Sequence, residues 1–247
     1  TPHGDWPKNI DTAKRPPSGD SGKRAGTFDN GATVGELRVL ARAYRITGDA
    51  SYQQAFLRGF DHIIKAQYAN GGWPQYYPLS KAYHRHITFN DGTMIRLMDF
   101  LRDVNGDPDF AFLNADRRNA ASEAVHRGVE CIVKCQVLVD GVPTVWCAQH
   151  DAESLTPVQA RSYELPSLSG SESAGILKFL MSIDDPSPAV VRAVNAGVAW
   201  FDQVKIEGQR YRRSKTEPPL SPDPKAAPLW ARFYEIQSNR PIFSDRD

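Results

Sequence analysis

Residues 28–48 read FDNGATVGELRVLARAYRITG, and the apolar side chains in this stretch recur every three or four positions. The repeat is carried by Val34, Leu37, Ala41 and Tyr44, which is the spacing of one face of an α-helix. Gly48 follows the last apolar position, where a glycine commonly ends a helix. We therefore predict a helix from about residue 34 to Gly48 that buries this stripe.

The same spacing recurs five more times and predicts five more helices. The stripes are Phe56, Phe60, Ile63 and Ile64, after a cap at Ser51; Met94, Leu97, Met98 and Leu101; Val125, Gly128, Ile132 and Cys135; Ile176, Leu177, Leu180 and Ile183; and Val191, Val194, Val198 and Phe201. Alternation of period two is nearly absent. Only residues 137–145, around Asp140-Gly141, indicate a short hairpin of strands. The sequence therefore predicts a mainly α protein.

The predicted helices form pairs, and the residues that open the pairs repeat. FDNGAT (28–33) opens the first pair and FNDGT (89–93) the second, which places Asp29 and Asp91 62 residues apart. SGSES (169–173) opens the third pair without the aromatic and acidic residues. This period is much longer than the roughly 34 residues of short helical solenoids.

Long loops join these pairs at residues 68–89 and 137–170, and they are rich in Gly, Pro and aromatic residues. Functional sites are commonly built from such loops. We expect three helical hairpins in a ring, an α/α toroid left as an incomplete barrel, within a single catalytic domain over residues 1–247.

The composition excludes several classes of protein. There are 30 Lys and Arg against 29 Asp and Glu, and the formal charge of +1 argues against a globally basic nucleic-acid binder. No apolar run reaches the ~18 residues that a membrane span needs. Cys131, Cys135 and Cys147 lack the fourth, closely spaced ligand of a zinc site, so buried thiols are favoured over one incidental disulfide. We expect a monomer without a nucleic-acid or membrane partner.

Two acidic residues open predicted helices, and each has an asparagine beside it: Asp29 with Asn30, and Asp91 with Asn90. One interpretation is helix capping. The other starts from the ring, which brings equivalent helix starts toward one face. There the carboxylates and amides would form a partial oxygen cage. Ca²⁺ takes six to eight oxygen ligands in irregular geometry, and an acidic substrate could complete such a cage.

Arginines in loop or aromatic surroundings indicate an anionic substrate. Arg161, Arg232 and Arg246 are of this kind, and the guanidinium group binds carboxylates in two-point fashion, as a polyuronate would require. Surface ion pairs are the alternative for each of them. His84 and His86 flank Arg85, but no third ligand of a transition-metal site is visible near them.

A glycoside hydrolase on the same toroid is a serious rival. Such an enzyme needs an acid and a base, and candidates are Asp29, Asp91, Asp151 and Glu153. A non-catalytic module that binds uronans is a second alternative.

Six motifs occur in order along the chain: GDWPKN (4–9), FDNGAT (28–33), GGWPQY (71–76), FNDG (89–92), RSYELP (161–166) and NRP (239–241). Together they closely resemble polysaccharide lyase family ten, the pectate lyases with an α/α toroid. The resemblance implies cleavage of α-1,4-polygalacturonate by calcium-assisted β-elimination, which gives 4,5-unsaturated oligogalacturonides. It also implies a secreted bacterial enzyme, extracellular or periplasmic, that degrades pectin of the plant cell wall. The signal peptide would lie outside this chain.

The resemblance also implies roles for individual residues. Asp29 and Asp91 would bind calcium beside the substrate carboxylate, with Asp29 counted among the catalytic residues, and Arg161 would be the catalytic base. Asn30, Arg232 and Arg246 would bind the substrate. Lys8, Tyr163 and His150 are the alternative bases, because an arginine ordinarily stays protonated. The chain is expected to stop before the final helix of the family and to be one module of a larger secreted enzyme.

Overall fold

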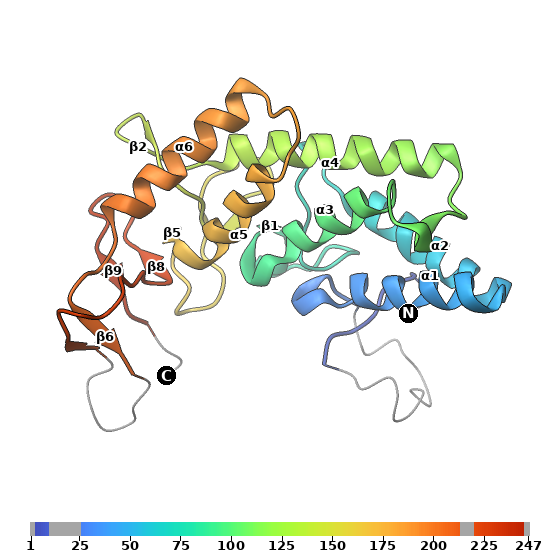
Figure 1. Ribbon diagram of the computed structural model, residues 1–247, viewed down its shortest axis with the longest axis horizontal. Coiled ribbons are helices and arrows are strands. Elements are labelled where there is room, and N and C mark those ends of the chain that lie inside the picture. The colour runs from blue at the N-terminus through green and yellow to red at the C-terminus, as the bar shows by residue number, and fades with distance from the viewer. Residues whose placement is uncertain (1–2, 10–25, 213–219, 245–247) are drawn as a thin grey trace.

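The computed structural model describes residues 3–9, 26–212 and 220–244, and these residues fold mainly into helices. Six α-helices in this part of the chain form three hairpins that follow one another in an arc (Figure 1). The hairpins are α1 (Val34–Thr47) with α2 (Ala50–Ala66), α3 (Thr93–Asp103) with α4 (Ala115–Cys135), and α5 (Gly170–Met181) with α6 (Pro188–Gln203). Helices α1, α3 and α5 pack in one layer, and α2, α4 and α6 in a second. The predicted fold, an incomplete toroid of three hairpins, is confirmed.

The first two helices meet at the turn that the sequence predicts, with one correction. Helix α1 ends at Gly48, whose φ of 69° is a left-handed conformation that favours glycine. The cap of α2 is Asp49 rather than Ser51, because the Asp49 carboxylate accepts the backbone N–H of Ser51 at 2.8 Å. Ser51 thus supplies the N–H group that is capped.

Helix α6 buries a different stripe from the predicted one. Val191 and Val198 are 43% and 48% exposed, whereas the buried face consists of Val190, Ala193, Gly197 and Trp200. A Cβ atom on Gly197 would lie 2.9 Å from a methyl carbon of Leu177 on α5. The contact face is therefore chosen by close approach to α5 and by the large Trp200 ring, and not by the most hydrophobic periodicity.

Two buried tryptophans anchor the long loops to the helices. The indole N–H of Trp73 donates to the carbonyl of Ile63 in α2 at 3.0 Å. In the same way, Trp146 donates to the carbonyl of Ile132 in α4 at 2.7 Å. Both rings are fully buried, so these polar groups need internal partners. The loops that were expected to build a site are thus rigidly placed.

Short strands tie the loops to one another. Strand β1 (Ile87–Thr88) pairs antiparallel with β4 (Gln149–His150), which joins the two long loops. Strand β8 (Phe233–Tyr234) pairs with both β5 (Leu168–Ser169) and β9 (Pro241–Ile242), so the residues just before β8 lie beside the start of α5. The predicted hairpin forms between β2 (Leu138–Val139) and β3 (Val142–Pro143), and β6 (Gln209–Tyr211) pairs with β7 (Leu220–Pro222).

The three cysteines are buried free thiols, as favoured by the sequence. The Sγ atoms of Cys131 and Cys135 lie 4.0 Å apart on α4. Of the helices described here, none combines the length and the apolar character required to cross a membrane.

Candidate active site

Two short 3₁₀ turns precede the first two helical hairpins and pack against each other. They are η2 (Asp29–Gly31) and η4 (Asn90–Gly92). In each turn the first residue is buried and the second is exposed with a positive φ, 53° at Asn30 and 52° at Asp91. Asn and Asp adopt this left-handed conformation more readily than other non-glycine residues. Asp29 and Asn90 therefore occupy equivalent first positions of the two turns, and Asn30 and Asp91 occupy the second positions. The sequence pattern had instead paired Asp29 with Asp91.

Neither aspartate caps a helix. The N-cap residues of α1 and α3 are Thr33 and Gly92, and no side chain caps either helix. The capping interpretation is therefore wrong for both carboxylates. Asp29 and Asp91 come from adjoining turns, one carboxylate buried and one exposed.

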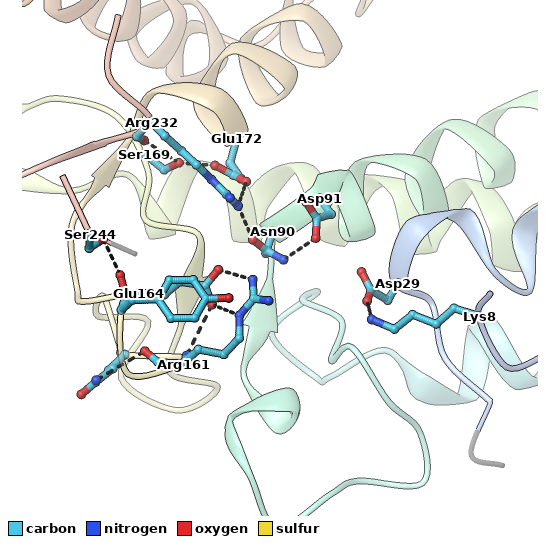
Figure 2. A network of polar contacts seen from close by, with 12 residues as sticks. Lys8, Asp29, Asn90, Asp91, Arg161, Glu164, Ser169, Glu172, Arg232 and Ser244 are labelled. Atoms are coloured by element: carbon cyan, nitrogen blue, oxygen red, sulfur yellow. Dashed lines mark hydrogen bonds and ion pairs between the residues drawn. The ribbon is translucent and has the colours of Figure 1, made fainter. Parts of the chain in front are cut away.

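The buried carboxylate of Asp29 is paired with Lys8 (Figure 2). Partial burial by itself would lower the pKa of Lys8, but the hydrogen bond and charge of Asp29 outweigh it and raise that pKa. The second oxygen, Oδ1, is buried and has no hydrogen-bond partner among the described residues. A carboxylate oxygen buried without a partner is costly, and an ion or a water molecule could supply the contact.

A chain of polar contacts reaches Asp91 from the third hairpin (Figure 2). Asn90 donates from Nδ2 to Asp91 Oδ2 at 2.8 Å, and its Oδ1 accepts from Arg232 Nη2 at 2.9 Å. The same Arg232 nitrogen lies 3.3 Å from Glu172 Oε1. The hydroxyl of Ser169 donates to the other oxygen of Glu172.

Arg161 forms a two-point ion pair with Glu164 in the loop before β5. Arg161 Nε donates to Glu164 Oε2 at 2.7 Å, and Nη2 donates to Oε1. The guanidinium also lies 4.9 Å from the centre of the Tyr163 ring. The hydrogen bonding that Arg161 donates to Glu164 raises the pKa of Arg161 above its already high ordinary value.

The three acid–base pairs share one arrangement. Each places a carboxylate that is 2–3% exposed behind a cation that is 33–43% exposed: Lys8 with Asp29, Arg161 with Glu164, and Arg232 with Glu172. The carboxylates hold the cations in place and reduce their mutual repulsion, while part of each cation stays accessible. Accessible cations fixed in this way suit a substrate that carries a carboxylate on every unit.

Electrostatic contacts place the Lys8–Asp29 pair and Arg161 near one histidine, His84. Burial lowers the pKa of His84, the charges of Lys8 and Arg161 lower it further, and Asp29 opposes them. All three residues therefore lie around this imidazole, which stacks on Tyr83 with ring centres 4.0 Å apart.

A cleft of about 800 Å³ adjoins the two arginines. Arg161 and Arg232 are the charged residues among its described lining. The remaining wall is largely apolar and includes Tyr211, Trp230 and Phe243, which are 46–69% exposed. An arginine pair beside aromatic surfaces can hold a sugar by its carboxylate and by its ring faces.

Two other candidate residues, His150 and Asp151, are held in contacts within the protein. His150 is fully buried, accepts the N–H of Cys147 at 3.0 Å, and has a pKa lowered to about 4, chiefly by burial. The prediction of His150 as an alternative base is therefore wrong, because a base must reach the substrate and this side chain does not reach the surface. The carboxylate of Asp151 accepts the backbone N–H groups of Glu153 and Ser154 at 3.0 and 2.9 Å, which closes a local turn. Arg246 lies outside the described residues.

Sequence reasoning missed Glu164 and Glu172 as parts of the site, and it placed the amide of Asn90 in an oxygen cage without its contact to Arg232. For Glu172 a signal existed, because Ser169 and Glu172 have the Ser-x-x-Glu spacing of a capping box. In the structure the serine bonds the glutamate directly and makes no side-chain cap. The partner of Glu164 is Arg161, three residues earlier, and its burial comes from the fold, whereas the partner of Asn90, Arg232, is brought to it only by the fold.

Comparison with known proteins agrees with this geometry. A family model described as pectic acid lyase matches residues 1–247. Two solved structures of the family 10 polysaccharide lyase from Cellvibrio cellulosa are similar to the chain, each with a TM-score of 0.90. One, a mutant in complex with trigalacturonic acid, is 39% identical, with 99% of this chain and 78% of that chain covered. The other is 40% identical, with 99% and 77% covered. Among curated proteins no sequence matches.

The fold, the cation-lined cleft and these matches define an enzyme of the polysaccharide lyase class. Within that class, the chain belongs to the pectic acid lyase family, and it is a pectate lyase. Membership in a lyase family sets aside the hydrolase and the non-catalytic binding module.

Proposed function

We propose that this pectate lyase cleaves α-1,4-polygalacturonate by calcium-assisted β-elimination and releases 4,5-unsaturated oligogalacturonides. The observation that carries the proposal is the grouping of Asp29 and Asp91 with cations that are each anchored by a buried carboxylate. The trigalacturonic acid bound to the similar Cellvibrio enzyme supports the same substrate class.

The residues fit a calcium ion completed by the substrate. Asp29 Oδ1 is buried and has no partner in the described part of the chain, and the adjoining Asp91 residue is exposed. Across the described ranges, no three His, Cys, Asp or Glu side chains gather as a closed metal site. We propose that Asp29 and Asp91 hold the ion and that a uronate and water supply the other oxygens. Bound there, calcium would withdraw charge from the uronate and make its α-hydrogen more acidic.

In the proposed reaction the C5 hydrogen, which lies α to the carboxylate, is removed as a proton by Arg161. The electron pair of the C5–H bond forms the C4=C5 double bond, and the C4–O bond breaks with its electrons on the leaving oxygen. That oxygen then takes up a proton, so no water is consumed. Arg232, and Arg246 in the undescribed end, would hold uronate carboxylates, with Asn30 as a further substrate contact at the exposed turn.

The pairing of Arg161 with Glu164 should make the rate of the reaction depend on pH in a particular way. A guanidine can accept a proton only in its neutral form, and Glu164 raises the pKa of Arg161, so the neutral fraction is small and grows with pH. We therefore expect kcat/KM on polygalacturonate to rise with pH up to at least about pH 10. Initial rates measured at constant ionic strength and saturating calcium test this. A plateau below about pH 8 would assign the proton transfer to another group.

Product analysis tests the proposed function. Polygalacturonate incubated with the protein and calcium should yield oligosaccharides that absorb ultraviolet light, because each cleavage creates a double bond conjugated to a carboxylate. New reducing ends without absorbance would instead indicate hydrolysis. Binding without any product across a range of pH and calcium concentrations would contradict a lyase reaction.

We propose that the enzyme acts outside the bacterial cytoplasm, as a monomeric catalytic domain over residues 1–247, on pectin of the plant cell wall. The polymeric nature of the substrate supports this location, since a polysaccharide must be shortened before uptake.

A further inference from the structure

Glu172, in the first turn of α5, holds the substrate-facing Arg232 from behind. Its side chain is 3% exposed, one oxygen accepts from Ser169, and the other lies 3.3 Å from Arg232 Nη2. A buried carboxylate needs such partners, because without them its charge would be strongly disfavoured. Glu172 is therefore committed to this contact and lies too deep to meet a polysaccharide.

Arg232 is fixed by more than this ion pair. Its carbonyl accepts the backbone N–H of Gly170 at 2.9 Å, which ties its main chain to the start of α5. Its guanidinium lies 4.9 Å from the centre of the Phe233 ring and lines the cleft, with the side chain 43% exposed. Its side-chain hydrogen bonds to Asn90 and Glu172 both use Nη2, so neither of these contacts occupies Nε or Nη1.

Asn90 connects this arginine to the acidic turn. Its amide is 4% exposed, and its two ends are used differently: the oxygen accepts from Arg232 at 2.9 Å, and the nitrogen donates to Asp91 at 2.8 Å. Because an amide has one donor end and one acceptor end, the cation on one side and the anion on the other permit a single orientation. A shift of Arg232 would therefore disturb the hydrogen bond to Asp91.

We propose that Glu172 is a positioning residue for Arg232, and that Glu172, Arg232 and Asn90 form a relay that couples uronate binding at Arg232 to cation binding at Asp91. The inference rests on the proposed function only for the identity of the two ligands. Residues behind a metal ligand typically change metal affinity by about 10–100-fold when they are replaced.

Binding measurements on Glu172→Gln test the relay without turnover. This isosteric change removes the charge that holds Arg232. We expect calorimetry to show about tenfold weaker binding of trigalacturonic acid in calcium-free buffer, and about tenfold weaker binding of calcium to the protein alone. Glu130→Gln, the same change at an exposed residue of α4, is the matched control and should alter neither affinity. Circular dichroism and thermal unfolding monitor folding.

A second variant, Asn90→Ala, breaks the relay at its other end and keeps the test available if Glu172→Gln folds poorly. It should weaken calcium binding to a similar degree, and the double variant should be no weaker than the more affected single variant. Unchanged calcium binding in Glu172→Gln, or fully additive losses in the double variant, would overturn the relay. Failure of the wild-type protein to form unsaturated product would instead contradict the proposed function. The measured affinities for calcium and trigalacturonic acid would still test the relay in that case.

Discussion

We expect Arg161→Ala to lower kcat on polygalacturonate by about 10³-fold, within the range for loss of a general base. The side chain is 33% exposed and lines the cleft beside Arg232, so it can reach a bound sugar. The substitution also leaves the carboxylate of Glu164 buried and without its cation, which costs stability. A lower rate in this variant alone would therefore combine two effects.

Two further variants separate them. Arg161→Lys keeps a positive charge beside Glu164 but loses the two-point geometry and part of the reach, so turnover should still collapse while the protein stays folded. Arg161→Ala combined with Glu164→Gln removes both charges and should restore thermal stability without restoring kcat. Arg192→Ala, at an exposed position of α6, is the matched control. Turnover above about a tenth of wild type in Arg161→Lys would place the base elsewhere.

Removal of calcium should abolish the formation of unsaturated product. Excess EGTA takes away the charge that acidifies the α-hydrogen, and we expect at least a 100-fold loss of rate, within the range of about 10²–10³ for loss of one stabilising contact. Added calcium should restore the rate fully. Full activity in EGTA, with contaminating metals removed, would contradict a calcium mechanism.

The Asp91→Asn variant links that requirement to a residue. Asp91 is exposed, so loss of its charge should leave the fold intact while the calcium concentration for half-maximal activity rises about tenfold or more. Asp184→Asn, at an exposed position after α5, makes the same chemical change away from the turns and should leave the calcium dependence unaltered. An unchanged calcium dependence in Asp91→Asn would remove this aspartate from the proposed ligand set.

The arrangement of buried carboxylates behind exposed cations explains how a nearly neutral chain can bind a polyanion. The formal charge is +1, so the molecule as a whole exerts little attraction. Locally, a buried carboxylate of the protein fixes each of three cations: Lys8, Arg161 and Arg232. Fixed cations lose little side-chain entropy on binding, which favours affinity for a substrate with regularly spaced charges.

The periodicity of apolar residues was sufficient to predict three hairpins, and Gly48 marked the end of the first helix. Val34, Leu37 and Ala41 are buried as predicted, and Gly48 ends α1. The failure at α6 has a physical cause, since the buried stripe of Val190, Ala193, Gly197 and Trp200 contains small residues that a hydrophobic pattern ranks below the valine stripe beside it. Packing of Gly197 against Leu177 selects between them, and that contact is not local in sequence.

For the site, motifs identified Asp29, Asp91 and Arg161, and aromatic surroundings indicated Arg232, but neither showed how these residues are held. An acidic residue such as Glu172 has the same local sequence character whether it is solvated or buried. Its role depends on Arg232, 60 residues away, and the role of Asn90 depends on the same arginine across 142 residues. The sequence by itself thus determined the hairpins and the chemistry available at their openings. Only the tertiary structure decided that the three carboxylates are buried and that Asp29 anchors Lys8 and Glu172 anchors Arg232, because these depend on contacts between segments that the chain order leaves apart, whereas Arg161 and Glu164 are three residues apart.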